Sequence, residues 1–182
     1  MAGDRIHIVL PKEATRPEGG TYIQFKLDVD EHDWPPADWE ALWARREDYR
    51  TYRVLSIPAF VHKIAVNDLV WSKTGDERDI HFDHKIDSGG HSTIRVFMRE
   101  DVSDEVIEQV VAEIRASGCE IQRTSWDAII AVDIPSEVAF GRLYEDCLIP
   151  RSDAGELSVE SACMTFGSAP DAWPPPHNAN PA

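Results

Sequence analysis

The residues of this sequence best suited to chemistry lie in and after one glycine turn. Ser88-Gly-Gly-His-Ser-Thr93 places an imidazole and two hydroxyls directly after two glycines. Glycine lets the backbone of a turn approach a ligand closely, and the exposed amides of such a turn can bind an anion. We therefore predict a ligand-binding site made of Ser88, Gly89, Gly90, His91, Ser92, Thr93 and Arg95.

His91 and Ser92 also have the side-chain types of a general base and a nucleophile. Adjacent side chains on a strand point to opposite faces, so this pair is poorly placed for a proton transfer. An interdomain turn whose hydroxyls and imidazole bond the local backbone explains the same residues without catalysis. We predict no catalytic residue, and keep a small enzyme or ligand sensor using His91 and Ser92 as the alternative.

A second set of candidate ligands precedes the turn in His81-Phe-Asp83-His84. On a strand, His81 and Asp83 share one face and His84 points to the other, so a site using both histidines needs a bulge. Solvated strand side chains are the expected outcome, and a metal site at His81, Asp83 and His84 is the alternative. We expect no cofactor.

The chain is strongly acidic, and the charge is unevenly distributed. The formal net charge is −15 at pH 7; residues 91–182 carry 16 acidic against 6 basic side chains and no lysine. Such a field repels nucleic acid and anionic membranes and attracts basic proteins. We predict a basic protein partner, no nucleic-acid or membrane binding, and contacts at Glu100, Asp101, Asp104, Glu105, Glu108 and Glu113. An acidic surface that only maintains solubility is the alternative. The charge leaves the oligomeric state open.

The remaining composition describes a globular chain. Of its 182 residues 42% are hydrophobic, six are tryptophan, and no apolar run reaches the ~18 residues of a membrane span. The three cysteines, at positions 119, 147 and 163, form no CxxC pair, which is typical of reduced thiols. The N-terminus lacks the pattern of a signal peptide. We expect a cytoplasmic protein.

Short alternating segments predict a β-rich first half. After an N-terminal strand and loop in residues 1–20, residues 21–29 alternate as a half-buried strand, and further strands follow to residue 88. About five short strands with turns are typical of a small SH3-like barrel. One helical turn is expected here, capped by Asp38, because Trp39 and Trp43 are four residues apart.

Residues 89–165 are predicted to be a βαββαβ module. Ser103 is expected to cap a helix over residues 104–117, and Pro135 to begin a second helix. This order is typical of a ferredoxin-like fold, so the predicted fold class is α+β. The sheet face that carries Phe97 is expected to pack on the first module. The Pro-rich end in residues 166–182, with Trp173-Pro-Pro-Pro, is expected to be disordered.

Several of these segments together resemble a known family. They are Trp34-Pro-Pro, Leu42-Trp-Ala, Tyr52-Arg-Val-Leu-Ser-Ile-Pro, Asn67-Asp-Leu-Val, Gly90-His-Ser-Thr-Ile-Arg-Val, Gly118-Cys and Ala131-Val-Asp-Ile-Pro. In this order they resemble the DUF4265 family of bacterial proteins, common in actinobacteria, over residues 20–165. The family's usual Gly-Asp turn is Asn67-Asp68 here. The resemblance implies no particular activity, cofactor or partner.

Overall fold

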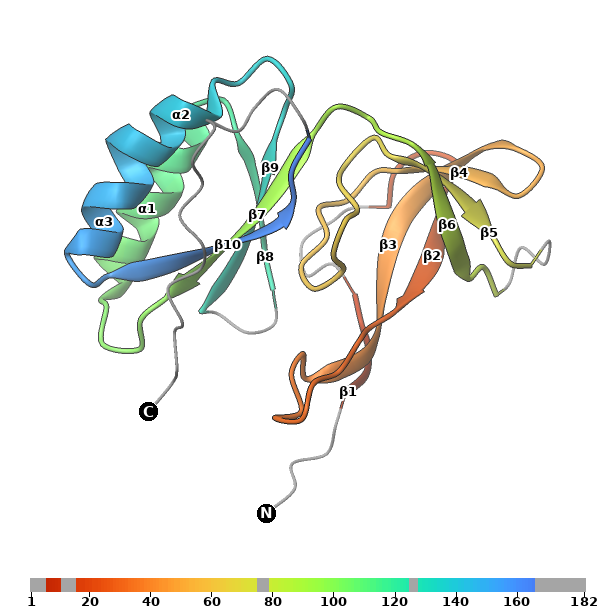
Figure 1. The fold of residues 1–182 in the computed structure, drawn as a ribbon, viewed down its shortest axis with the longest axis horizontal. Helices are drawn as coiled ribbons and strands as arrows, with labels where there is room; N and C mark the ends of the chain where they lie inside the picture. The colour runs from red at the N-terminus through yellow and green to blue at the C-terminus, as the bar shows by residue number, and fades with distance from the viewer. Residues whose placement is uncertain (1–5, 11–15, 75–78, 125–127, 166–182) are drawn as a thin grey trace.

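The described residues of the computed structural model, 6–10, 16–74, 79–124 and 128–165, form two β-sheets with helices beside the second sheet only (Figure 1). The first sheet contains β1 (Ile6–Val9), β2 (Gly20–Lys26), β3 (Ala37–Asp48), β4 (Thr51–Val54), β5 (Leu69–Ser72) and β6 (Phe82–Asp87). The second contains β7 (Ser92–Met98), β8 (Glu120–Arg123), β9 (Ile129–Ile134) and β10 (Leu157–Cys163). The helices are α1 (Asp104–Ala116) and a continuous run of α2 (Phe140–Leu143), the π-helix η1 (Tyr144–Leu148) and α3 (Ile149–Asp153). The fold is therefore α+β, as predicted.

The long strand β3 organises the first sheet. It pairs in parallel with β1 and antiparallel with β2 and β4. The predicted helical turn after Asp38 is therefore wrong. Along β3, Leu42 and Ala44 enter the core on one face, while Trp43 stacks on Tyr22 across the strand pair at 3.7 Å between ring centroids. Pairing on both sides satisfies the β3 backbone, so the spacing of two tryptophans did not decide its conformation.

The first sheet forms no closed barrel among the described residues. Its strand order is β1-β3-β4-β5-β6, with β2 on β3. β2 approaches the segment before β6 through one isolated bridge between Gln24 and His81, where the Gln24 N–H donates to the Ile80 carbonyl at 2.8 Å. The predicted small barrel is therefore not confirmed, although the predicted β-rich character of this half is correct.

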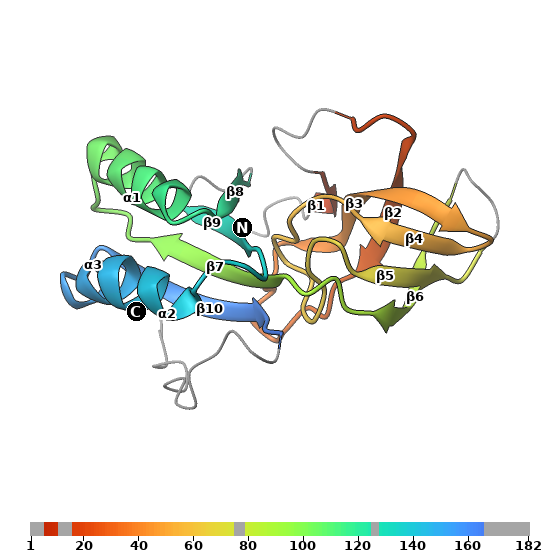
Figure 2. The ribbon, with the colours of Figure 1, turned by 90° about the horizontal axis from the view of Figure 1, so that it is seen from above.

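The second sheet has the order β10-β7-β9-β8 and is antiparallel throughout. The helices cover its face away from the first sheet (Figure 2). α1 begins at Asp104 as predicted, but the Ser103 side chain makes no cap hydrogen bond; its carbonyl accepts the Val106 and Ile107 N–H groups instead. The second helix begins at Phe140, later than predicted, because Pro135 starts a turn closed by the Val138 N–H. No helix in the described part of the chain is long and apolar enough to cross a membrane.

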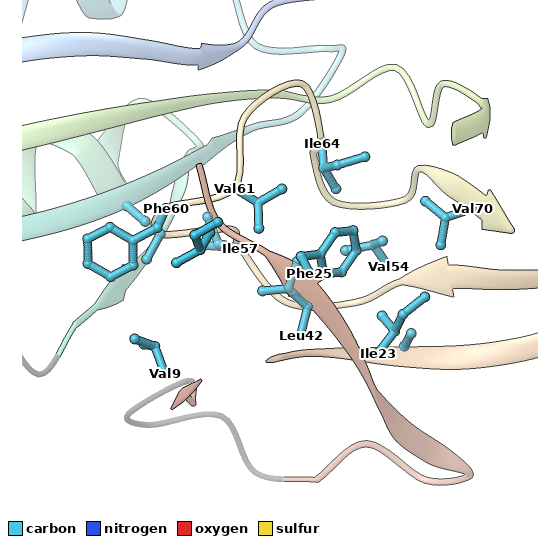
Figure 3. Packing of buried hydrophobic residues seen from close by; sticks show 14 of the residues in the cluster. Val9, Ile23, Phe25, Leu42, Val54, Ile57, Phe60, Val61, Ile64 and Val70 are labelled. Atoms are coloured by element: carbon cyan, nitrogen blue, oxygen red, sulfur yellow. The ribbon is translucent and has the colours of Figure 1, made fainter. Parts of the chain in front are cut away.

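The inner face of the second sheet packs on the first sheet, as predicted. Ile129 and Ala131 of β9 belong to the same buried cluster as the first sheet, and Phe97 of β7 packs against it. Figure 3 shows Phe60 of this cluster beside the strands of the second sheet. The two halves therefore share a core, and residues between them are removed from water. The Pro-rich end in residues 166–182 lies outside the described residues.

Gly89 lies in this junction at a backbone approach too close for any side chain. A Cβ on Gly89 would lie 2.3 Å from the Asn67 carbonyl carbon, whereas a Cβ on Gly141 would have nothing within 4 Å. We expect Gly89→Ala to lower the free energy of unfolding by about 2–3 kcal/mol, because the Asn67 backbone must move. The control Gly141→Ala should change it by less than about 1 kcal/mol. Urea denaturation measures both, and equal stability of the two variants would contradict the close approach.

Candidate functional site

The predicted glycine turn connects the last strand of the first sheet to the first strand of the second. Its amides are occupied by the chain itself: the Gly89 N–H donates to Asp68 Oδ1 at 2.9 Å and the Gly90 N–H to Ser88 Oγ at 3.2 Å. Gly90 has φ +83°, a conformation that favours glycine. The close approach of Gly89 is to the Asn67 backbone. Both glycines of the turn thus have a structural explanation within the protein.

His91 lies between two side chains that are distant in sequence. Its Nδ1 is 2.8 and 3.0 Å from the carboxylate oxygens of Asp133, and its Nε2 is 3.0 Å from Asn67 Nδ2. The amide nitrogen of Asn67 donates and the Asp133 carboxylate accepts, so these partners favour a neutral imidazole with its proton on Nδ1. Burial raises the pKa of Asp133 to about 6, although the hydrogen bond from His91 opposes that rise.

The neighbours of His91 on β7 have separate partners. The Ser92 hydroxyl, which is buried, accepts the Thr165 N–H at 3.1 Å. The Thr165 hydroxyl in turn donates to the His91 carbonyl at 2.6 Å. The hydroxyl of Thr93 is buried and has no hydrogen-bond partner among the described residues. The geometry therefore ties Ser92 to residue 165 and the His91 ring to Asp133 and Asn67.

Arg95 is the most deeply buried charged member of the predicted site, with 2% of its surface exposed. Its Nη1 donates to Glu160 Oε1 at 3.0 Å and lies 3.1 Å from His62 Nε2, and its Nη2 donates to the Val61 carbonyl at 3.1 Å. Glu160 belongs to β10, whereas His62 and Val61 lie in the connection between β4 and β5. The guanidinium thus joins the two halves of the protein. Burial and the charge of Arg95 lower the pKa of His62.

Glu40 fixes the same connection from the first sheet. Glu40 is buried, with 2% of its surface exposed. Its carboxylate accepts hydrogen bonds from the N–H groups of Ala59, Phe60 and Val61 at 2.7, 2.8 and 2.8 Å. Burial raises the pKa of Glu40, while these three donors and the charge of Arg95 oppose the rise. Glu40 and Arg95 therefore hold consecutive parts of one loop by opposite charges.

Five residues of this junction were not identified from the sequence: Glu40, His62, Asn67, Asp133 and Glu160. Only Glu40 carries a local signal. It occupies the core-facing position of an alternating strand with Leu42 and Ala44, which marks a buried acid once the segment is recognised as β. The others meet Arg95 and His91 from distant elements, so their spacing in the sequence contains no sign of the contact.

The candidate metal ligands bind their neighbours instead of gathering. His81 Nε2 is 2.9 Å from Asp79 Oδ1, and His84 Nδ1 is 3.0 Å from Asp83 Oδ2. Over the ranges that the structure describes, no three His, Cys, Asp or Glu side chains gather in a way that would hold a metal ion.

The six acidic side chains predicted to bind a partner are all exposed on α1 or on the loop before it: Glu100, Asp101, Asp104, Glu105, Glu108 and Glu113. Glu108 pairs with Arg123, and Glu113 accepts from Arg151 Nη2 at 2.6 Å. The hydrogen bonds from Arg151 lower the pKa of Glu113. Exposed Glu145, Asp146 and Asp153 continue the acidic surface along η1 and α3.

The buried guanidinium supplies a direct stability test. We expect Arg95→Met to lower the free energy of unfolding by about 3–5 kcal/mol, because buried Glu40 would lose the nearby cation and half-buried Glu160 would lose its ion-pair partner. The same change at exposed Arg99, 3.9 Å from Asp101, should cost less than about 0.5 kcal/mol. Chemical denaturation followed by tryptophan fluorescence compares the two. A similar small effect at both positions would contradict a stabilising role of Arg95.

Comparison with known proteins agrees with this architecture. The crystal structure of a hypothetical protein from Neisseria gonorrhoeae superposes with a TM-score of 0.64 at 20% sequence identity, covering 81% of this chain and 96% of that chain. The two proteins therefore share a fold. No curated protein matches the chain. The model of the family described as "Domain of unknown function (DUF4265)" matches residues 40–159, from the buried Glu40 to the first half of β10. This match covers well over half of the sequence, and the protein belongs to the DUF4265 family.

Proposed function

We propose that this protein is a non-catalytic binding module whose acidic helical side holds a basic partner protein, as an immunity protein, an antitoxin or another inhibitory regulator does. The observation that carries this proposal is the placement of the acidic side chains. The helices cover the face of the second sheet that is turned away from the first sheet (Figure 1), and the acidic side chains of these helices are exposed.

The acidic helical side is defined by exposed residues of α1, η1, α3 and the loop before α1. They are Glu100, Asp101, Asp104, Glu105, Glu108, Glu145, Asp146 and Asp153. Within the described part of the chain, Asp104, Glu145, Asp146 and Asp153 have no ion-pair partner, whereas Glu108 pairs with Arg123. Carboxylates concentrated on one side repel one another, and a cationic partner relieves that repulsion. The same field accelerates the approach of a basic protein and makes binding sensitive to salt.

The geometry of the glycine turn favours a binding module over the catalytic alternative. A general base needs a free ring nitrogen directed at a substrate, and both ring nitrogens of His91 have protein partners. The Ser92 hydroxyl is buried and bonded to the Thr165 backbone. These contacts support a structural role for both side chains.

Two finer inferences accompany the proposal. The order β-α-β-β-α-β and the helices on one sheet face support a ferredoxin-like second module, and the short antiparallel strands support a relationship of the first module to SH3-like barrels. The three cysteines are buried and unpaired, which supports a reducing compartment, and we place the protein in the cytoplasm.

The proposal predicts a partner whose binding depends on the acidic helical side. A tagged pull-down from the native lysate, eluted with a salt gradient and analysed by mass spectrometry, identifies the candidate. The purified pair is then measured by calorimetry with a variant that neutralises Asp101→Asn, Glu108→Gln, Glu145→Gln and Asp146→Asn. We expect its affinity to fall about tenfold, since four exposed charge contacts contribute a few tenths of a kcal/mol each.

The matched control removes four exposed carboxylates elsewhere: Asp28→Asn, Glu31→Gln, Asp83→Asn and Asp87→Asn. Both variants have the same net charge, so a loss caused by total charge would affect them equally. The proposal is supported by a stoichiometric basic partner whose affinity falls for the first variant and not for the control. Equal affinity of both variants, or no stoichiometric protein partner, contradicts it.

A further inference from the structure

A chain of three side chains connects the two sheets beside the glycine turn. Asn67 belongs to the first sheet through its backbone: its N–H donates to the Val54 carbonyl at 2.9 Å, and its carbonyl accepts from Arg53 Nη1 at 2.8 Å. Its φ of +65° is a left-handed conformation that asparagine tolerates better than most residues. The side-chain amide alone reaches across to His91.

His91 belongs to the second sheet. Its Nδ1 is held by Asp133 of β9 at 2.8 Å, and its carbonyl accepts the Thr165 hydroxyl that follows β10. The contact between Asn67 Nδ2 and His91 Nε2, 3.0 Å long, is therefore a hydrogen bond from one half of the protein to the other. The His91 side chain is 16% exposed, so solvent protons reach it, while Asp133 is almost fully enclosed.

The positions of the protons in this chain follow from its donors and acceptors. One proton lies between Nδ1 and the Asp133 carboxylate, and Nε2 must be free of a proton to accept from the Asn67 amide. A further proton on Nε2 turns the ring into an imidazolium, which keeps its bond to the Asp133 carboxylate and is stabilised by that opposite charge. There it would face the N–H of Asn67, and two donors cannot form a hydrogen bond.

The surroundings of Asp133 favour uptake of that proton. Glu120 of β8 is its partner across the strand pair, Glu137 follows β9, and buried Cys119 precedes β8. Burial, Glu120 and Glu137 raise the pKa of Asp133 to about 6, and only His91 among these neighbours lowers it. Since Asp133 and His91 share a hydrogen bond, they titrate as a pair.

We propose that Asn67, His91 and Asp133 form a proton-sensitive latch between the two sheets, closed at neutral pH and released when the His91–Asp133 pair binds one proton in mildly acidic solution. Release breaks the contact from Asn67 to His91. The contacts of Asp68 to the Ala65 and Gly89 amides and to Lys85 do not involve the latch and remain.

The release is local. A carboxyl whose folded-state pKa is raised from 3.8 to about 6 binds protons more tightly in the folded than in the unfolded chain. The stability that it contributes is fully present below about pH 3.8 and is lost as the pH rises through 6. Asp133 therefore does not unfold the protein as the pH falls from 7 to 5, and the Asn67 contact opens within a folded molecule.

Nuclear magnetic resonance of ¹⁵N-labelled protein between pH 7.5 and 5 tests the latch. Long-range ¹H–¹⁵N spectra show which imidazole nitrogen carries a proton, and circular dichroism verifies that the fold persists. We expect the Nδ1–H form at pH 7.5, protonation of Nε2 as the pH falls towards 5, and a shift of the Asn67 side-chain amide with the same midpoint. An Nε2 that stays unprotonated at pH 5, or an Asn67 amide that does not respond, overturns the proposal.

Two variants separate the latch from ordinary histidine titration. Asn67→Ala removes the opposing donor and should raise the midpoint of the pair by about 0.5–1 pH unit, the size of one neutral hydrogen bond. Asp133→Asn should make Nε2 take up its proton only at lower pH, because the imidazolium would lose the carboxylate that Nδ1 contacts. His84, exposed and 3.0 Å from Asp83, is the internal control. Its titration should be the same in all three proteins, and an unchanged His91–Asp133 midpoint in Asn67→Ala refutes the latch even if Asp133→Asn does not fold.

Discussion

The guanidinium of Arg95 is buried between the two sheets and needs hydrogen-bond and ion-pair partners. The arrangement of the junction supplies those partners. A buried charge without partners is far more costly than a buried hydrocarbon side chain. Here Glu160, the Val61 carbonyl and the His62 ring surround the guanidinium, and the Glu40 carboxylate contributes its charge from the first sheet. These groups come from β10, β3 and the connection between β4 and β5. The cation is therefore satisfied only when both sheets are folded and in contact.

Contacts within the same junction explain the glycine turn. It lies where β6 gives way to β7, and the backbone of Gly89 rests against Asn67 with no room for a side chain. That approach places the Asn67 amide on His91 and Asp68 on the Gly89 N–H. Two polar contacts thus accompany the apolar contact of Ile129 and Ala131 with the first core. The polar contacts are directional, so they fix the orientation in which the apolar faces meet.

The outer face of the second sheet contrasts with this junction. Its helices bury an apolar stripe that includes Val110, Val111 and Ile114, and they leave their carboxylates in water. The acidic excess of the chain is thereby separated from its buried charges. At the junction Arg95 pairs with Glu160 and its charge also acts on Glu40, while the helical side presents an excess of negative charge. The buried charges and the exposed acidic side chains therefore lie on opposite faces of one sheet.

Local patterns predicted those elements whose conformation depends on their own residues. Residues 21–26 alternate and form β2, α1 begins at Asp104 with acids in its first turn, and the order of the second module follows from turn residues and periodicity. The helical turn predicted after Asp38 was wrong. The spacing of its two tryptophans suits a helix, but pairing with three other strands decides the conformation of the segment. The helix expected from Pro135 began later for a similar reason, since a turn closed by the Val138 N–H came first.

The sequence by itself determined the α+β composition, the family, the distribution of charge and the stretch around His91 that lies at the junction. Only the tertiary structure decided what that stretch contacts. Asp133 lies 42 positions from His91 and Glu160 lies 65 positions from Arg95, and both pairs meet through strand registers set by the whole second sheet. A strand pattern specifies which side chains share a face, but not which distant strand lies beside it. For that reason the glycine turn was predicted as an anion-binding loop, whereas its amides hold Asp68 and Ser88 of the protein itself.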